Sequence, residues 1–485
     1  MIWPDLVAGE RNLRARELFS VVRSMTRRAT TFLLALLIAG LATAPARASH
    51  TQTMTFEAPR DLLDPAYRAS AFDQIAGLGA HRLRIVLYWK DVAPSADSST
   101  KPAFDMTDPA SYDWSKYDPA IEEAKARGWP VLLTVSGPVP KWATLARRDY
   151  KTRPSPTEFQ RFMTAVAKHY GDKVAQFAIW NEPNDPNFLL PQYFKGQVAS
   201  PQWYRKLFLA GVQGLKAGGV ANPSVLLGET APRGSSTTVA PLTFLRKTLC
   251  LSNTYVRDRS CGALHAAGYA HHAYTTRAGP FFVPPKKDDV TIGVLGRLVT
   301  ALDRAAKTGA IAKSMPIYLT EFGIQSVPDP FSVSQQRQAE YQAISERLAW
   351  DQPRVKAFSQ YLLRDDAPRT NGPKSDRYGG FESGLRFADG RAKMSLKAFP
   401  VPLAALRRGS RVTLWGLARL AGARTKVTVL SGVKTFRTYK TYTTDAHGYF
   451  TKTVPYVKGR QYRLRWTSPQ GKVYTGTPIR VYVRR

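Results

Sequence analysis

The chain has 485 residues, with 70 lysines and arginines against 36 acidic side chains and a formal net charge of +34. A chain this long exceeds one ordinary core, so two or more domains are expected. The charge indicates attraction to polyanions such as cell-wall polymer, nucleic acid or acidic lipid. With only two cysteines and no zinc-finger spacing, the sequence does not indicate a specific nucleic-acid function.

The N-terminal region has the pattern of a secretory signal peptide. Arg27 and Arg28 precede an apolar run, Thr31–Leu41, and small residues suited to cleavage follow between Ala42 and Ala48. A membrane anchor is the alternative, but the run is well short of the roughly 20 residues that a span needs. We therefore predict export, with no membrane span after cleavage and an extracellular or cell-wall-associated product.

The first 24 residues resemble neither a signal peptide nor a folded segment. Met25 is a natural start, so they are either an extension or an unusually long n-region. Residues 1–48 are assigned to an N-terminal extension and signal peptide and are excluded from the fold prediction.

Strand and helix patterns alternate through the next part of the chain. The expected strands are Thr53–Phe56, Arg82–Tyr88, Val131–Val135, Val174–Trp180, Ser224–Gly228, Gly268–His272, Met315–Glu321 and Ala357–Leu362. The expected helices are Ala66–Leu78, Asp118–Arg127, Pro156–Tyr170, Thr291–Lys307 and Ser334–Trp350. This α/β alternation predicts a (β/α)8 barrel over residues 49–400. A doubly wound sheet would also alternate, but no glycine-rich phosphate turn follows any strand.

Two of the expected strands end in a glutamate. Val174–Trp180 leads into Asn181 and Glu182, and a second apolar run ends at Glu321. One such glutamate is weak evidence, because many strand ends are simply solvated. Two carboxyl groups on two strand ends are what acetal hydrolysis needs, one to protonate the leaving oxygen and one to attack or stabilise the anomeric carbon.

The motifs W-N-E-P-N and L-T-E-F-G, in this order, resemble the retaining glycoside hydrolases of clan A, near families 5 and 39. The resemblance implies that Glu182 is the acid/base, that Glu321 is the nucleophile and that Asn181 binds the sugar 2-hydroxyl. It implies a hydrolase acting on O-glycosidic bonds, β-configured, in a poly- or oligosaccharide, without a metal or organic cofactor. The chain lacks the histidine after strand three and the tryptophan of strand eight, which weakens any transfer of substrate specificity.

Other strand ends carry further candidates for substrate binding. Arg84 resembles the strand-two arginine that holds the nucleophile in clan A, although a surface arginine is the alternative. His272 and Tyr274 resemble the His-x-Tyr pair of strand six, whose tyrosine bonds the nucleophile. Four aromatic residues at or just beyond strand ends are either a sugar-binding floor or core packing: Trp89, Trp142, Phe322 and Tyr361.

A catalytically inactive barrel that binds cell wall or polysaccharide is the alternative function. The feature that separates the two hypotheses is the intact pair of glutamates, with the His-x-Tyr pair beside it. A barrel that had lost catalysis would be expected to have lost one of them.

Cys250 and Cys261 flank a short polar loop, S-N-T-Y-V-R-D-R-S. In an exported protein a pair this close is predicted to form a disulfide. A metal site would need more ligands than this region shows.

Residues 401–485 change to short alternating strands, which predicts a small β-sandwich after the barrel. The segment has 18 lysines and arginines and one acid, Asp445. It is interpreted either as a module that binds an anionic cell-wall polymer or as a spacer with a solvated basic surface.

Overall fold

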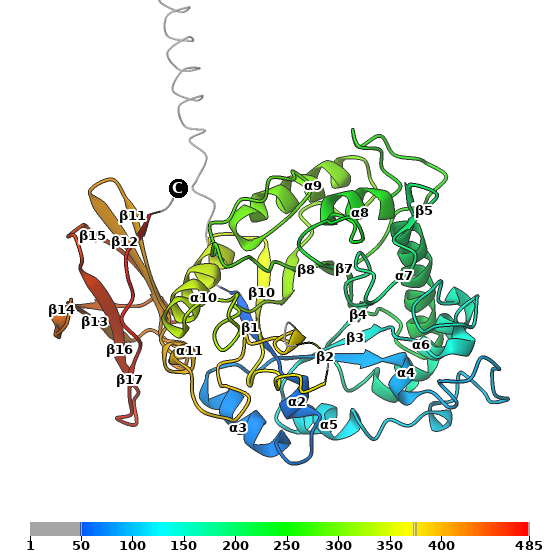
Figure 1. The fold of residues 1–485 in the computed structure, drawn as a ribbon, viewed down its shortest axis with the longest axis horizontal. Helices are drawn as coiled ribbons and strands as arrows, with labels where there is room; N and C mark the ends of the chain where they lie inside the picture. Colours follow the sequence, from blue (N-terminus) through cyan, green and yellow to red (C-terminus); the bar gives the residue numbers. More distant parts are fainter. Residues whose placement is uncertain (1–48, 50, 372, 374–375, 484–485) are drawn as a thin grey trace, which may run out of the picture. The chain divides into compact units, whose positions relative to one another are not determined.

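The computed structural model describes residues 49, 51–371, 373 and 376–483 (Figure 1). The predicted extension and signal peptide, residues 1–48, lie outside the described residues. Among the helices that are described, none combines the length and apolar character needed to cross a bilayer.

Eight parallel strands close into a barrel, in the spatial order β1-β10-β9-β8-β7-β4-β3-β2. Their bounds are β1 (Thr53–Glu57), β2 (Leu83–Tyr88), β3 (Val131–Ser136), β4 (Gln176–Ile179), β7 (Val225–Thr230), β8 (Gly268–His272), β9 (Ile317–Glu321) and β10 (Val355–Tyr361). The predicted barrel is therefore confirmed, and each expected strand coincides with one of these within a few residues.

Helices surround the ring of strands (Figure 1). The longer ones are α3 (Arg68–Gly77), α5 (Asp118–Ala126), α6 (Pro156–Tyr170), α7 (Ser200–Ala217), α8 (Pro241–Thr248), α9 (Leu295–Lys307) and α10 (Gln335–Trp350). The short ones are α2 (Pro59–Leu62), α4 (Trp89–Val92) and α11 (Met394–Ala398), and a small hairpin pairs β5 (Tyr193–Phe194) with β6 (Gln197–Val198). Ser155 caps α6, because its hydroxyl accepts a hydrogen bond from the Glu158 N–H at 3.3 Å.

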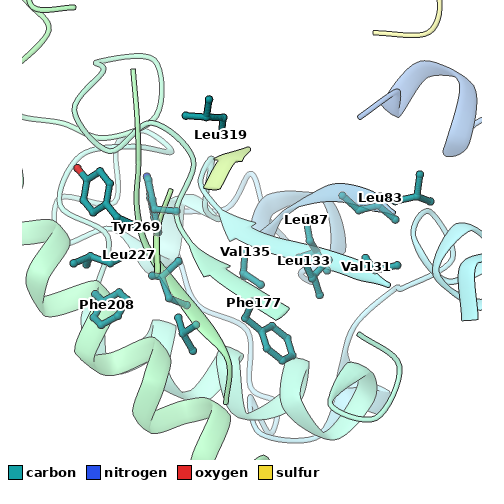
Figure 2. Packing of buried hydrophobic residues seen from close by; sticks show 14 of the residues in the cluster. Leu83, Leu87, Val131, Leu133, Val135, Phe177, Phe208, Leu227, Tyr269 and Leu319 are labelled. Atoms are coloured by element: carbon teal, nitrogen blue, oxygen red, sulfur yellow. The ribbon is translucent and has the colours of Figure 1, made fainter. Parts of the chain in front are cut away.

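The barrel core follows the two-residue alternation of its strands. One set of side chains packs with residues of the surrounding helices, such as Phe208 of α7, and includes Leu133, Phe177 and Leu227 (Figure 2). The alternate set points into the barrel. It contains small or aliphatic residues such as Leu132, and it also contains Arg84 of β2, which is 1% exposed. A buried cation inside the barrel requires acidic partners nearby.

Two four-stranded sheets follow the barrel, with orders β15-β12-β11-β18 and β14-β13-β16-β17. Their bounds are β11 (Leu403–Arg408), β12 (Arg411–Leu417), β13 (Lys426–Gly432), β14 (Phe436–Thr443), β15 (Tyr449–Pro455), β16 (Gln461–Thr467), β17 (Val473–Thr475) and β18 (Tyr482–Val483). One apolar cluster joins residues of both sheets, including Leu414 and Leu464, so the sheets pack face to face.

The C-terminal sheets also pack against α10 of the barrel. Ile344 and Trp350 of α10 share an apolar cluster with Trp415 and Tyr449 of the β15-β12-β11-β18 sheet. The described residues from 49 to 483 accordingly belong to one compact unit. The division of this unit into two domains at residue 400 remains a proposal.

Candidate active site

Glu321 ends β9, and Glu182 follows β4 by three residues at the same end of the barrel. The backbone turns sharply around Glu182, with φ of 72° at Trp180 and 39° at Glu182. Non-glycine residues in this region carry strain that the surroundings must offset. Here the Glu182 N–H donates to the Glu229 carbonyl at 3.0 Å, which fixes the turn against β7.

His272, at the end of β8, lies between the two glutamates. Its Nδ1 is 2.9 Å from Glu182 Oε1 and 3.6 Å from Glu321 Oε2. Burial lowers the pKa of His272 despite the neighbouring Glu321 charge, so the ring is neutral near pH 7. A neutral ring offers Glu182 no positive charge to offset its own burial.

Glu182 is protonated at neutral pH. Burial raises the pKa of the Glu182 carboxyl to about 8, and the negative charge of Asp185 adds to the shift. The guanidinium of Arg84 acts in the opposite direction, but it does not outweigh burial. A carboxyl that holds its proton near pH 7 can act as a general acid.

Glu321 has a hydrogen-bond donor at each carboxylate oxygen. The Tyr274 hydroxyl donates to Oε1 at 2.7 Å, and Arg84 Nη1 donates to Oε2 at 3.1 Å. Donors on both oxygens fix the orientation of the carboxyl group. The two glutamates therefore lie in contrasting surroundings, because burial dominates at Glu182 whereas two hydrogen-bond donors contact Glu321.

Arg84 is the centre of the buried polar network. Its Nη1 also contacts Glu57, its Nη2 donates to Asn181 Oδ1 at 2.6 Å, and its Nη2 and Nε both contact the Glu229 carboxylate. Burial lowers the pKa of Arg84, but the nearby Glu229, Glu57 and Glu321 outweigh burial and raise it well above its usual value. The guanidinium thus stays charged inside the barrel.

Three of the four predicted aromatic residues are not available to a sugar. Trp89 and Trp142 pack edge to face at 5.8 Å, and Trp89 stacks on Phe162 at 4.8 Å. Both tryptophans, like Phe322, are at most 2% exposed. For these three residues the core-packing alternative therefore applies, with Phe322 packed against Tyr274 and Phe358, whereas Tyr361 is partly exposed at the end of β10.

The sequence analysis missed Glu57 and Glu229, which end or nearly end β1 and β7 and bind Arg84. Thr134 of β3 joins them, because its hydroxyl donates to Glu229 at 3.1 Å. The signal was present: both residues repeat the pattern of an apolar strand ending in a glutamate that singled out Glu182 and Glu321.

A cleft of about 620 Å³ opens at the ends of β1, β2 and β10. Its lining includes Glu57, Tyr88, Lys116, Tyr361 and Arg364. A cavity of this size accommodates a ligand of a few sugar units. Glu57 therefore connects the cleft to the Arg84 network, because its carboxyl group also contacts the Arg84 guanidinium.

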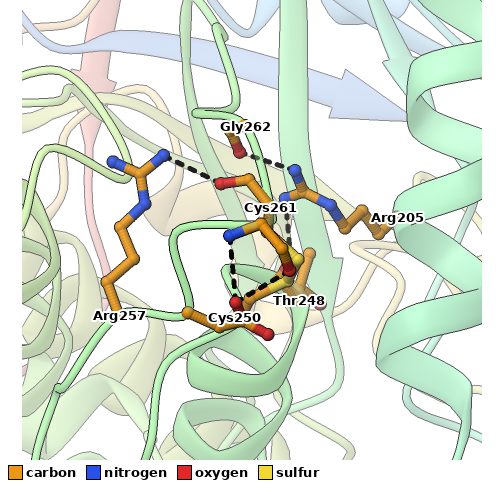
Figure 3. Close-up of a disulfide and its surroundings, with 8 residues drawn as sticks. Arg205, Thr248, Cys250, Arg257, Cys261 and Gly262 are labelled. Carbon is orange, nitrogen blue, oxygen red and sulfur yellow. Dashed lines mark hydrogen bonds between the residues drawn. A yellow bond between two sulfur atoms is a disulfide. The ribbon is translucent and has the colours of Figure 1, made fainter.

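Cys250 and Cys261 form a disulfide, as predicted (Figure 3). Arg205 and Arg257 bond to carbonyls around it, with Arg257 donating to the Cys261 carbonyl at 3.0 Å. The bridge joins the end of α8 to the segment that enters β8. It therefore lies toward the strand N-termini, at the opposite end of the barrel from the glutamates.

No protein-family model matches the sequence, and a search of curated proteins finds no match. Solved glycoside hydrolase structures are similar to the chain, and they include members of families 39 and 5. A glucosidase from Croceicoccus marinus has a TM-score of 0.50 and 11% identity, over 86% of this chain and 94% of that one.

A monomeric β-xylosidase from Caulobacter crescentus has a TM-score of 0.49 and 16% identity, over 87% and 97% of the two chains. A family 39 enzyme from Xanthomonas axonopodis pv. citri has a TM-score of 0.47 and 16% identity, over 87% of this chain and 94% of that one. At these identities the likeness to the glucosidase establishes a shared fold, so function has to be argued from the site.

Proposed function

We propose that the protein is a retaining glycoside hydrolase that cleaves O-glycosidic bonds, β-configured, in a poly- or oligosaccharide by double displacement. The observation that carries this proposal is the approach of both glutamates to His272. Glu182 Oε1 lies 2.9 Å and Glu321 Oε2 lies 3.6 Å from the same nitrogen, His272 Nδ1. The distance between these two oxygens is therefore at most the sum of the two values. That limit is compatible with the separation of about 5–5.5 Å of retaining enzymes, and it reaches only the lower edge of the range of about 6.5–9.5 Å of inverting ones.

Glu182 and Glu321 take different roles because their surroundings differ. The protonated Glu182 gives its proton to the glycosidic oxygen as the bond to the anomeric carbon breaks. Glu321, oriented by hydrogen bonds from Tyr274 and Arg84, attacks that carbon and forms a covalent glycosyl-enzyme. Glu182 then removes a proton from water, and the resulting attack releases the sugar with its original anomeric configuration.

Asn181 is suited to hold the sugar 2-hydroxyl. Its Oδ1 accepts a hydrogen bond from Arg84 at 2.6 Å, which fixes the amide orientation. Its Nδ2 has no hydrogen-bond partner within the described part of the chain and is free to donate. Hydrogen bonds to the 2-hydroxyl strengthen in the transition state and add to catalysis.

The roles of the two glutamates are tested with alanine variants and azide. We expect Glu321→Ala to lose nearly all turnover and azide to restore some of it, giving a glycosyl azide of inverted configuration. We expect Glu182→Ala to keep the first step on 2,4-dinitrophenyl glycosides, whose leaving group needs little protonation. Glu122→Ala, on the exposed face of α5, is the control. If the two active-site variants behave the other way round, Glu321 is the acid/base and Glu182 is the nucleophile.

We also propose that the protein is secreted after cleavage of the signal peptide in residues 1–48. The supporting pattern is the basic, apolar and small-residue order of that segment. Intact mass of the secreted product should place its first residue between Thr43 and Ser49. A product that begins at Met1 would contradict export.

The C-terminal sheets are proposed to hold the enzyme on an anionic cell-wall polymer. Support comes from charge: residues 401–485 hold 18 cations and one acid, and Lys426 and Arg465 are exposed on neighbouring strands of one sheet. Such binding should weaken as salt rises above physiological strength.

The test is co-sedimentation of the full chain with anionic cell-wall fragments across a salt series. We expect Lys426→Ser/Arg465→Ser to reduce retention more than the matched control Lys216→Ser/Lys313→Ser, whose lysines are exposed on the barrel. Equal retention of both double variants, or retention that does not change with salt, would favour a spacer.

A further inference from the structure

Glu57 connects the buried Arg84 network to the cleft. It ends β1, pairs in register with Tyr361 of β10, and lines the cleft of about 620 Å³. Glu229, another carboxyl group on Arg84, is 0% exposed. Glu57 is therefore a carboxyl group of this network that a ligand in the cleft can reach.

Glu57 shares one nitrogen of Arg84 with the proposed nucleophile. Arg84 Nη1 contacts Glu57 Oε2 and also lies 3.1 Å from Glu321 Oε2. The same guanidinium binds Glu229, so one positive charge faces three carboxyl groups. Three buried anions around one cation would leave an excess of negative charge, which is costly, and a proton on one carboxyl group reduces that excess.

The proton belongs on Glu57. Burial raises the pKa of Glu57 to about 8, the Arg84 charge opposes this shift, and the charges of Glu321 and Glu229 add to it. Because Oε2 accepts from Arg84, the proton resides on Oε1. Within the described residues Oε1 has no hydrogen-bond partner, so its O–H is free to donate to a ligand.

Two tyrosine hydroxyls on the same cleft wall are also free. Tyr88 and Tyr361 line the cleft, and neither hydroxyl has a hydrogen-bond partner among the residues that the structure describes. Tyr117 lines it as well, but its hydroxyl donates to Asp91 at 2.9 Å and accepts from the Tyr88 N–H. Glu57, Tyr88 and Tyr361 therefore offer three uncommitted hydroxyl groups.

We propose that Glu57, as an uncharged carboxylic acid, binds a hydroxyl group of the sugar unit in the catalytic cleft, with Tyr88 and Tyr361 contacting its neighbouring hydroxyls. The inference rests on the proposed glycosidase function and names a substrate-binding residue for it. A carboxylic acid can both donate to and accept from a sugar hydroxyl, whereas a carboxylate can only accept. The site therefore selects a sugar whose hydroxyls are free and rejects one methylated at the bound position.

The charge state of Glu57 depends on groups from several elements. Those that face it are Arg84 and Tyr88 of β2, Glu229 of β7, Tyr274 after β8, Glu321 of β9 and Tyr361 of β10, with Lys116 and Arg364 farther along the cleft. Among these groups, Arg84 is the only cation that contacts Glu57. Deprotonation of Glu57 therefore places a negative charge close to Glu321 without a further cation to offset it. Binding of the hydroxyl should then weaken above pH 8.

The test uses 2,4-dinitrophenyl glycosides of a panel of sugars and their monodeoxy analogues. Because this leaving group needs little protonation by Glu182, the fall of kcat/KM at alkaline pH reports the ionisation of Glu57. The wild type should lose activity above pH about 8, and Glu57→Gln, which is always neutral, should not. Glu57→Ala should lower kcat/KM by about tenfold or more on the parent sugar. It should have little effect on the monodeoxy analogue that lacks the bound hydroxyl.

Glu122→Gln, an exposed carboxyl-to-amide change on α5, is the matched control. An alkaline fall that persists unchanged in Glu57→Gln would overturn the proposal, as would an equal effect of Glu57→Ala on every analogue. If the wild type hydrolyses no member of the panel, the proposed function fails. The protonation of Glu57 is then tested separately, by the pH dependence of the free energy of unfolding.

The unfolding measurement has a defined sign. Glu57 titrates near pH 4.3 in an unfolded chain but stays protonated up to about pH 8 in the folded one. The wild type should therefore lose stability relative to Glu57→Gln as pH rises from about 4.3 to 8. Parallel stability curves for the two proteins across this range would show that Glu57 is ionised when folded, and that would overturn the proposal.

Discussion

The Tyr274 hydroxyl donates a 2.7 Å hydrogen bond to Glu321 Oε1. Arg84 Nη1 donates to the other oxygen of the same carboxylate, and the two donors come from different barrel strands or their ends. A carboxylate held from both oxygens has its orientation fixed before substrate arrives. This arrangement holds the proposed nucleophile in place a few ångströms from Glu182, since both glutamates approach His272.

Replacing Tyr274 with phenylalanine should slow attack by Glu321. A hydrogen bond to a charged group contributes about 1.5–3 kcal/mol, so we expect kcat on a 2,4-dinitrophenyl glycoside to fall by about 10- to 150-fold. Tyr439→Phe, on the C-terminal sheets, is the control. An unchanged kcat for Tyr274→Phe would show that the hydroxyl does not support the nucleophile.

The alkaline limit of activity should follow Glu182 when the leaving group is poor. Glu182 has a pKa of about 8, so the acid form is lost and kcat/KM for an alkyl glycoside falls as pH rises above that value. Asp185→Asn removes the charge that helps to raise this pKa, so the fall should move to lower pH. A pH profile that is the same in Asp185→Asn and the wild type would contradict this cause.

Breaking the buried ion pair between barrel and C-terminal sheets should destabilise the whole unit. Arg419 of the segment after β12 donates to both carboxylate oxygens of Glu346 of α10 at 2.8 Å, and both side chains are at most 6% exposed. Arg419→Ala leaves Glu346 buried and unpaired, which costs about 3–5 kcal/mol. Denaturant unfolding measures this, and Arg419→Met/Glu346→Leu should recover most of the loss. A small loss for Arg419→Ala alone would show that the interface opens in solution.

Removing the disulfide should lower stability without changing chemistry. Cys250 and Cys261 are 11 residues apart, and closing such a loop contributes about 3 kcal/mol in the chain-entropy model. Cys250→Ser/Cys261→Ser should therefore unfold at lower denaturant concentration while keeping the wild-type kcat. A large fall in kcat would mean that the bridge supports the active-site end of the barrel.

The barrel strands could be predicted because buried parallel strands are short apolar runs between helical periods. The same pattern placed Glu182, Glu321 and His272 at strand ends, where the structure brings them together. Glu57 was missed because the first strand was expected to end at Phe56, one residue too early. Register at a strand end depends on pairing with neighbours, and a single sequence does not specify it.

For Trp89 and Trp142, residue type alone was not enough to predict whether the side chain faces a ligand or the core. An aromatic residue after a strand can face a ligand or turn back into the helix layer, and α4 turns Trp89 back toward Phe162. In the C-terminal sheets, β14 has the sequence F-R-T-Y-K-T-Y-T, which shows little of the apolar alternation typical of a strand. Pairing with β13 on one side is what makes it a strand.

The central claim is that Glu321 forms a covalent bond to the sugar, and trapping that intermediate tests it most directly. A 2-deoxy-2-fluoro glycoside with a dinitrophenyl leaving group forms the glycosyl-enzyme but releases it slowly. After incubation and proteolysis, mass spectrometry should find one fluorosugar on the peptide that contains Glu321, and none in the Glu321→Ala variant. A label on Glu182 or Glu57 instead, or hydrolysis of the parent glycoside with inverted product and no label at all, would contradict the account.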